Sequence, residues 1–275
     1  MEKYIIKLIG SYLNVLSYVS ADYAANKALH LFSKPRKGKL TQKHEAFLSF
    51  ANKKILKYDD LNIATYHWQG DKETILLAHG WESNSARWKR KIEFFTEEGF
   101  NVIALDAPAH GASGSKLFNA LLYSEFINVV AQKYEPQIVI GHSVGGMAAV
   151  FHQQKYQLDS IQKMVLLGAP SEFENVLKNY INLLGYNKKI EKNLGRIIFN
   201  RFGAVPTEFS TSKFAKNIAA EGLIIHDIKD PIIPFSDAEL IKSNFKNSIL
   251  ISTNGFGHSL NNTKVTESIV NFIKS

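Results

Sequence analysis

The sequence has 275 residues, of which 45% are hydrophobic and 21% are charged, a composition typical of a folded chain with one large domain. Lys and Arg outnumber Asp and Glu by 33 to 25, but the basic residues are scattered apart from a cluster at residues 34–43. The chain contains no Cys, which excludes disulfides and thiolate metal sites and fits a cytoplasmic location. No zinc pattern, helix-turn-helix or aromatic-interleaved basic stripe is visible, so no nucleic-acid partner is expected.

Residues 1–45 are predicted to form an N-terminal helical extension that is apolar around much of its girth. The sequence favours a helix packed on the domain that follows it. Two alternatives stay open: an interfacial helix making peripheral membrane contact through residues 1–43 with help from the basic cluster, or a cleaved signal peptide. The uncharged run at residues 8–21 is short for a bilayer span. Pro35 and Gly38 mark a linker.

From residue 53 the pattern changes to short strands. Residues 53–58 and 61–68 alternate apolar and polar side chains across Asp59 and Asp60, which predicts an antiparallel hairpin at a sheet edge. Strands and helices then alternate, which predicts a mostly parallel sheet covered by helices on both faces, an α/β fold. The strands are expected at 74–78, 102–105, 138–140, 164–167, 223–226 and 248–251, and the helices at 85–98, 119–134, 143–156, 236–245 and 262–273.

Residues 141–145 read Gly-His-Ser-Val-Gly, between a buried strand and a helix. This spacing is typical of a nucleophile elbow, in which Ser143 sits on a strained turn and the flanking glycines permit close backbone approach. The amide dipoles of the following helix point at the serine and favour developing negative charge there.

Residues 171–221 are too long for a simple crossover and are rich in helix formers and apolar side chains. Such an insert is expected to lie over the carboxyl ends of the strands, where open α/β sheets bind ligands. We therefore predict a helical cap at 171–221 and an α/β core at 46–170 and 222–275.

A serine nucleophile requires a base and an orienting acid. His258 follows the last predicted strand, between glycines that let the loop turn inward, and suits the base. Asp230 follows a buried strand in a loop with two prolines and is preferred as the acid. Asp227 is the rival, and it could instead brace the turn.

Five segments, in this order, resemble the α/β-hydrolase superfamily over residues 53–275. They are LAHGW (77–81), LDAPAHGAS (105–113), GHSVGG (141–146), DPIIP (230–234) and GH (257–258). The resemblance implies that Ser143 is the nucleophile, His258 the base and Asp230 the orienting carboxylate. It also implies an oxyanion hole formed by the backbone N–H groups of Val144 and Trp81. The Trp81 side chain is expected to point along the pocket.

These features predict a serine hydrolase that cleaves a carboxylic ester or thioester of a small to medium apolar acyl group, with a small-molecule substrate, no cofactor and no metal. A membrane-surface lipase or acyltransferase, an aminopeptidase-like amide hydrolase and a non-catalytic binding protein on the same fold remain alternatives. His79, His110 and His226 are expected to brace backbone, and His142 to point away from the serine.

Overall fold

The computed structural model describes residues 2–275, and it divides them into two compact units. The core unit comprises Pro35–Ser171 and Thr211–Ser275. The helical unit comprises the described residues up to Lys34 together with Glu172–Ser210. Residues 35–45 and 211–221, which the sequence analysis assigned to the extension and the cap, thus belong to the core unit.

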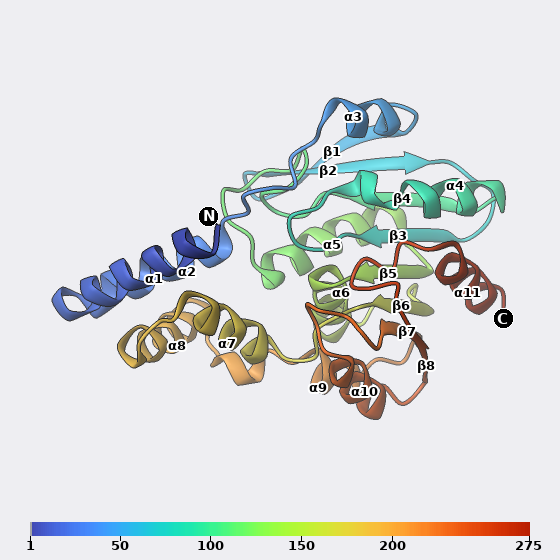
Figure 1. Cartoon of the computed structure of the whole chain (residues 1–275). Coiled ribbons are helices and arrows are strands. Elements are labelled where there is room, and N and C mark those ends of the chain that lie inside the picture. Colours follow the sequence, from blue (N-terminus) through green and yellow to red (C-terminus); the bar gives the residue numbers. More distant parts are fainter. Residues whose placement is uncertain (1) are drawn as a thin grey trace. The chain divides into compact units, whose positions relative to one another are not determined.

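The core unit is built on one eight-stranded sheet with the strand order β1-β2-β4-β3-β5-β6-β7-β8 (Figure 1). The strands are β1 (Asn52–Tyr58), β2 (Leu61–Trp68), β3 (Thr74–Ala78), β4 (Asn101–Leu105), β5 (Ile138–His142), β6 (Lys163–Leu167), β7 (Glu221–Asp227) and β8 (Ser248–Thr253). The pairs β1/β2 and β2/β4 are antiparallel, whereas the pairs from β4 to β8 are parallel. The predicted edge hairpin and the mostly parallel sheet are confirmed.

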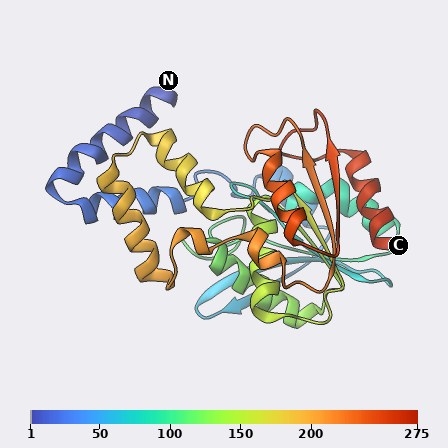
Figure 2. The same ribbon diagram turned by 90° about the horizontal axis from the view of Figure 1, so that it is seen from below.

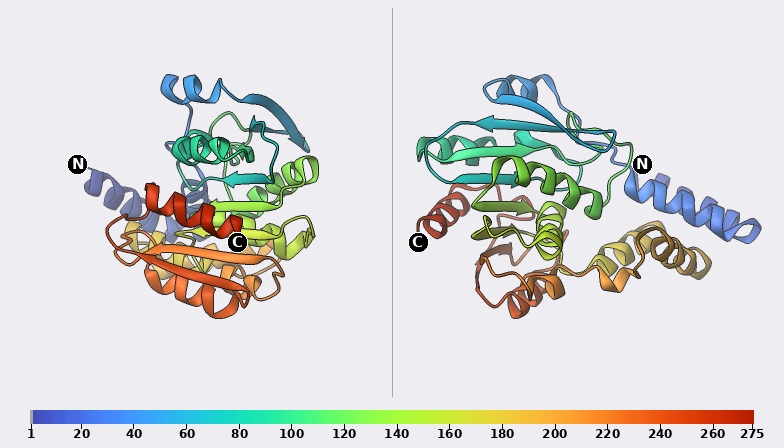
Figure 3. Two further views of the ribbon diagram at one scale, coloured as in Figure 1. Left: turned by 90° about the vertical axis from the view of Figure 1, so that its right-hand side faces the viewer. Right: turned by 180° about the vertical axis from the view of Figure 1, so that it is seen from behind.

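Helices cover both faces of this sheet, as Figure 3 shows from two further sides. One face carries α5 (Ala120–Tyr134), α6 (Val144–Tyr156), α9 (Thr211–Ala215) and α10 (Phe235–Asn244), and the other carries η1 (Ser85–Trp88), α4 (Lys89–Glu97) and α11 (Thr263–Lys274). Successive residues of a strand pack on opposite faces of the sheet. Leu76 packs in the hydrophobic core under α5 and α6, and Leu77 packs in the core under α4 and α11. Burial on both faces explains why β3 and β5 read as continuous apolar runs. The short helix α3 (Gln42–Leu48) was not expected from the sequence.

The helical unit combines helices from the start of the chain with helices that come much later in the sequence (Figure 2). It contains α1 (Glu2–Val19), α2 (Ala21–Ser33), α7 (Phe173–Leu184), α8 (Lys188–Phe202) and the single turn η2 (Pro206–Glu208). α2 packs along α8, and α1 packs on α2, α7 and α8. Within the helical unit, α1 therefore packs on the inserted helices; its packing on the catalytic domain stays a prediction.

Small and polar side chains join these helices. Gly10 lies so close to α7 that a Cβ atom on it would meet the Leu184 carbonyl oxygen at 1.7 Å. The Asn14 side chain donates to the Gly185 carbonyl at 2.8 Å and accepts from the Asn187 amide at 2.8 Å. The contacts between α1 and the α7–α8 turn therefore depend on residues more than 150 positions apart.

No helix within residues 2–275 is long and apolar enough to cross a membrane.

Candidate active site

Ser143 occupies the turn between β5 and α6, with φ 53° and ψ −127°. A positive φ is strained for a residue with a side chain, and it is sustained only where the surroundings hold it. The flanking glycines allow close contact: a Cβ atom on Gly141 would meet the Gly146 Cα at 2.4 Å, and one on Gly145 would meet the Ala78 carbonyl oxygen at 2.3 Å. The Ser143 N–H donates to the Leu167 carbonyl at 2.8 Å, which ties the turn to β6.

His258 lies on the loop between β8 and α11 and faces the serine. Its Nε2 is 3.0 Å from the Ser143 Oγ, and its Nδ1 is 2.7 Å from the Asp230 Oδ2. The structure thus brings the three residues predicted as nucleophile, base and acid into one hydrogen-bonded chain. This is the geometry that general-base activation of a serine requires.

The Asp230 side chain is fully buried and held by several donors. Its Oδ1 accepts hydrogen bonds from the amides of Ile232 at 2.8 Å and Ile233 at 3.1 Å, and the His226 Nε2 lies 3.4 Å from its Oδ2. Burial alone would raise the pKa of the Asp230 carboxyl, but the hydrogen bonds from His226, His258 and the two amides outweigh it and lower that pKa below its ordinary value. Asp230 is therefore ionised beside His258.

Asp227 serves the same loop in a different way. Its Oδ2 accepts from the Thr253 hydroxyl at 2.8 Å and from the Phe256 amide at 2.7 Å, and its Oδ1 accepts from the Lys229 amide at 3.0 Å. These bonds join the end of β7 to the loop that carries His258. The carboxylate braces the turn and does not contact the imidazole.

The predicted oxyanion donors are the backbone N–H groups of Val144 and Trp81. The Val144 N–H opens α6 directly after Ser143, and the Trp81 N–H follows Gly80, where a Cβ atom would come within 3.0 Å of the Ser143 Cβ. Among residues 2–275, neither amide is paired with an acceptor. Two unpaired donors close to a serine hydroxyl suit the stabilisation of negative charge on a substrate oxygen.

His79 holds the loop that presents Trp81. Its Nε2 accepts from the Ala107 amide at 2.9 Å, so its Nδ1 carries the proton and donates to the Gly80 carbonyl at 2.8 Å. Burial and the nearby His110 lower the pKa of His79 well below its ordinary value, which keeps this ring neutral.

The Trp81 side chain does not extend as an isolated ring. It packs edge-on against His110, at 5.3 Å between ring centroids, and against Phe118 at 5.4 Å. These two rings supply an apolar partner surface for the indole. That the side chain points along the substrate pocket stays a prediction.

His142 has a role that the sequence analysis missed. Its Nε2 lies 2.8 Å from the His258 carbonyl oxygen, and the two rings stand 4.9 Å apart between centroids. Burial, followed by nearby Arg87, lowers the pKa of His142 well below its ordinary value, so the ring stays neutral and donates to the carbonyl. The sequence pattern around Ser143 describes only local side-chain directions. The contact between His142 and His258 spans 116 residues, so no periodicity could have predicted it.

Two basic residues of η1 and α4 also hold the His258 loop. Arg87 donates to the Ser259 carbonyl at 3.0 Å, and Lys91 donates to the Leu260 carbonyl at 3.1 Å. Lys91 is only 3% exposed. Burial, followed by repulsion from Arg87 and Arg90, lowers the pKa of Lys91 to about 7.

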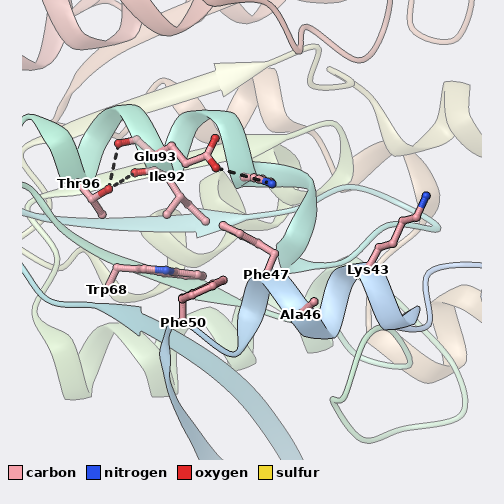
Figure 4. Close-up of a pocket in the computed structure, with 9 residues that line it drawn as sticks. Lys43, Ala46, Phe47, Phe50, Trp68, Ile92, Glu93 and Thr96 are labelled. Atoms are coloured by element: carbon pink, nitrogen blue, oxygen red, sulfur yellow. Dashed lines mark hydrogen bonds and ion pairs between the residues drawn. The ribbon is translucent and has the colours of Figure 1, made fainter.

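A separate groove of about 550 Å³ lies beside α3, β2 and α4 in the core unit (Figure 4). Phe47 and Trp68 stack in it with 5.5 Å between ring centroids. None of the residues that line it belongs to the predicted site. Among the described residues, no group of three or more His, Asp or Glu side chains is arranged to hold a metal ion.

Comparison of the sequence with known proteins identifies related hydrolases. The sequence model of the family described as serine aminopeptidase, S33, matches residues 69–201. The bifunctional esterase/perhydrolase of Acinetobacter calcoaceticus is 26% identical over 263 residues, which cover 74% of this chain and 93% of that protein. The chain belongs to the α/β-hydrolase superfamily.

Solved α/β-hydrolase structures match the fold of this chain. A putative lipase from Acinetobacter baumannii superimposes with a TM-score of 0.64 and 19% identity, covering 85% of this chain and 93% of the other. An esterase from Exiguobacterium antarcticum gives a TM-score of 0.62 at 19% identity, covering 80% and 99%. At such identities the likeness concerns the fold of this α/β-hydrolase, and its chemistry must be argued from its own site.

Proposed function

We propose that this α/β-hydrolase cleaves carboxylic esters or thioesters of small to medium apolar acyl groups through an acyl-serine formed on Ser143. The single observation that carries the proposal is the hydrogen-bonded chain from the Ser143 Oγ through His258 to Asp230, with separations of 3.0 and 2.7 Å. Relatives with esterase activity in their names, such as the Acinetobacter calcoaceticus protein, support the reaction class.

In the proposed acylation, the Ser143 Oγ attacks the carbonyl carbon while the His258 Nε2 takes the hydroxyl proton. Ionised Asp230 holds the Nδ1–H and stabilises the imidazolium that forms. The amides of Val144 and Trp81 bind the oxyanion, a contribution of about 3 kcal/mol for each such donor. His258 then protonates the leaving group, and water attacks the acyl-serine with His258 again as base.

The preference for an apolar acyl group rests on the composition of the inserted helices. Besides the side chains of their own core, α7 and α8 expose Leu183, Phe199 and Phe202. An apolar acyl chain is the substrate part that such a segment suits best.

The family description favours one second candidate, removal of an N-terminal amino acid. That reaction would require a carboxylate to hold the substrate ammonium group. Four acidic residues of the insert could serve this purpose, and each already binds a group within the helical unit: Glu172 the Ser210 hydroxyl, Glu174 Lys178, Glu191 Lys188 and Glu208 the Val205 amide. This pairing favours ester over aminopeptidase chemistry.

The test is hydrolysis of p-nitrophenyl esters from acetate to palmitate, with leucine p-nitroanilide in parallel. We expect turnover of the esters, a preferred chain length, and a loss of about 10⁴-fold or more in kcat for Ser143→Ala. Ser243→Ala, on the exposed part of α10, is the matched control and retains wild-type rates. Turnover of the anilide alone would replace the ester proposal by peptidase action. No turnover and no labelling of Ser143 by a fluorophosphonate would indicate a binding protein.

A further inference from the structure

The first helix of the chain turns an apolar face to the outside. Seven large side chains of α1 are between 51% and 85% exposed: Tyr4, Ile5, Leu8, Tyr12, Val15, Tyr18 and Val19. At 3.6 residues per turn all of them except Tyr18 fall within about 100° of the helix circumference, so these six form one continuous stripe. We call this stripe the α1 outer face.

The opposite face of α1 mixes the apolar residues Ile6, Ile9, Leu13 and Leu16 with small and polar ones. Its buried or half-buried residues include Gly10, Asn14 and Ser17, which meet the α7–α8 turn through close backbone contact and hydrogen bonds. A helix on a water-soluble protein normally buries its apolar stripe and exposes its polar one. The α1 outer face departs from this rule, because its exposed side chains are apolar over a continuous stripe, as in helices that lie at a lipid surface.

The exposed apolar side chains are concentrated in this unit. The helical unit is much the smaller of the two units, yet it carries most of the large apolar side chains that the described residues expose. A contiguous patch of this kind marks an interaction surface, whereas single exposed apolar residues require no explanation.

The charges around the stripe favour a lipid surface over a second copy of the chain. Between Leu8 and Val19 the helix carries no charge, and Glu2 is its only acidic residue. Two copies packed through this face would therefore lack the opposite charges that flank and orient paired helices. Lys7 of α1 is exposed, and the Lys189 Nζ lies 4.2 Å from the Tyr18 ring centroid. The sequence of the helical unit holds ten Lys and Arg against six Asp and Glu. This excess of positive charge suits anionic head groups.

The tyrosines point to the same partner. Tyr4, Tyr12 and Tyr18 are all at least 65% exposed. Tyr combines an apolar ring with a polar hydroxyl and is enriched where a membrane meets water. Because the inner face of α1 is already covered by α2, α7 and α8, only the outer face is free to contact lipid, and the helix would lie along the surface.

We propose that the α1 outer face binds the surface of an anionic lipid bilayer, with its apolar side chains inserted at the boundary between head groups and acyl chains. The proposal uses no residue of the catalytic chain and does not depend on the proposed reaction. It would hold the helical unit, and the enzyme with it, at a lipid surface.

Co-sedimentation with vesicles tests this proposal on the full chain. The vesicles are phosphatidylcholine alone and phosphatidylcholine mixed with phosphatidylglycerol. We expect wild-type protein to bind the mixed vesicles more tightly than the neutral ones. The double substitution Leu8→Gln and Val15→Gln should weaken binding to the mixed vesicles by at least about tenfold. Each substitution removes the favourable free energy of transferring an apolar side chain from water into the bilayer. The matched control replaces two exposed apolar residues of the core unit, Leu240→Gln and Ile249→Gln, and should bind as wild type does.

Hydrolysis of water-soluble p-nitrophenyl acetate separates this test from that of the reaction, because both double variants should keep the wild-type rate and the wild-type circular dichroism. Wild-type protein that stays in the supernatant with both vesicle types would overturn the proposal. Equal binding by Leu8→Gln/Val15→Gln would also overturn it. A wild-type dimer in sedimentation velocity that this variant abolishes, without vesicle binding, would assign the face to contact between copies.

Discussion

Asp227 and Asp230 stand three residues apart, yet their carboxylates hold different groups. Asp230 contacts the His258 Nδ1 at 2.7 Å, whereas Asp227 contacts the Phe256 amide at 2.7 Å and the Thr253 hydroxyl at 2.8 Å. Burial raises both pKa values, and the hydrogen bonds that each carboxylate accepts lower them further than burial raises them. Their stabilising effect is therefore complete above about pH 4 and is lost as the pH falls through the folded pKa values.

Substitution by Asn distinguishes the two aspartates. Asp230→Asn is expected to reduce kcat for the preferred p-nitrophenyl ester by about 10³- to 10⁴-fold, because the imidazolium loses its counter-charge and the ring its orientation. Asp227→Asn is expected to lower the free energy of unfolding by about 1 to 3 kcal/mol, because the amide cannot accept all three hydrogen bonds. It should keep kcat within about tenfold of wild type.

Steady-state kinetics and urea unfolding of both variants make the measurement. The reverse pattern, with kcat lost at Asp227 and retained at Asp230, would make Asp227 the orienting acid and overturn the assignment.

Lys91 is a second residue whose behaviour follows from burial. Its pKa of about 7 in the folded chain lies below the ordinary value near 10.5. Between these two values the unfolded chain binds more protons than the folded one, so the free energy of unfolding rises with pH. Relative to Lys91→Met, wild type should gain about 2 to 3 kcal/mol between pH 7 and pH 9.

The measurement is urea unfolding across this pH range. Lys89→Met is the matched control, since the Lys89 side chain is 59% exposed and pairs with Glu93 on the surface, and its curve should run parallel to that of wild type. A Lys91→Met curve that is also parallel would show that this lysine is protonated in the folded chain throughout.

At the scale of elements, the strand β5, the Ser143 turn and α6 act as one piece. The turn is possible because Gly141 and Gly145 leave room for the backbone of α6 and β3. Gly195 in α8 differs from these glycines, because no atom would lie within 4 Å of a Cβ atom added there. Close packing therefore requires glycine at position 145 but not at position 195, and alanine substitution should affect the free energy of unfolding differently at the two positions.

Gly145→Ala is expected to lower the free energy of unfolding by at least about 2 kcal/mol, because its Cβ would meet the carbonyl oxygens of Ala78 at 2.3 Å and His79 at 2.5 Å. Gly195→Ala is expected to raise it by about 0.5 to 1 kcal/mol through improved helix propensity. Thermal unfolding followed by circular dichroism measures both. A Gly145→Ala variant as stable as wild type would contradict the close packing of this turn.

At the scale of the whole molecule, a segment at the start of the chain and an insert far along it make one helical unit. α2 buries Ala24, Ala25 and Ala28 along α8, whose inward residues include Leu194 and Ile198. Asp22 forms an ion pair with Arg196, and the Asn26 side chain accepts from Arg201 at 2.9 Å. Neither segment has a complete core by itself. The designation of the insert as a cap over the catalytic residues stays a prediction.

Removal of residues 1–34 tests this interdependence. The truncated chain would expose the apolar side of α8, so we expect a severalfold increase in the fluorescence of bound anilinonaphthalene sulfonate and faster proteolysis within 172–210. Asp22→Ala, which removes only a surface ion pair worth about 0 to 1 kcal/mol, serves as the mild control. Unchanged dye binding and proteolysis after truncation would show that α7 and α8 fold without α1 and α2.

The sequence alone determined the elements of the core and their order. Buried strands with apolar runs, an edge hairpin with alternating residues and a glycine-flanked serine are local patterns that sterics and periodicity impose over a few residues. For this reason the fold class was predicted correctly, and Ser143, Asp230 and His258 were singled out before their contacts were known.

Only the tertiary structure decided the features that depend on distant residues. The contact of His142 with the His258 carbonyl spans 116 residues, and that of Asn14 with Gly185 spans 171. The sequence of α1 is apolar around most of its girth, so periodicity could not tell which side would pack. That choice followed from the fit of Gly10, Asn14 and Ser17 to the α7–α8 turn, which placed Leu13 inside and left Leu8, Tyr12 and Val15 exposed.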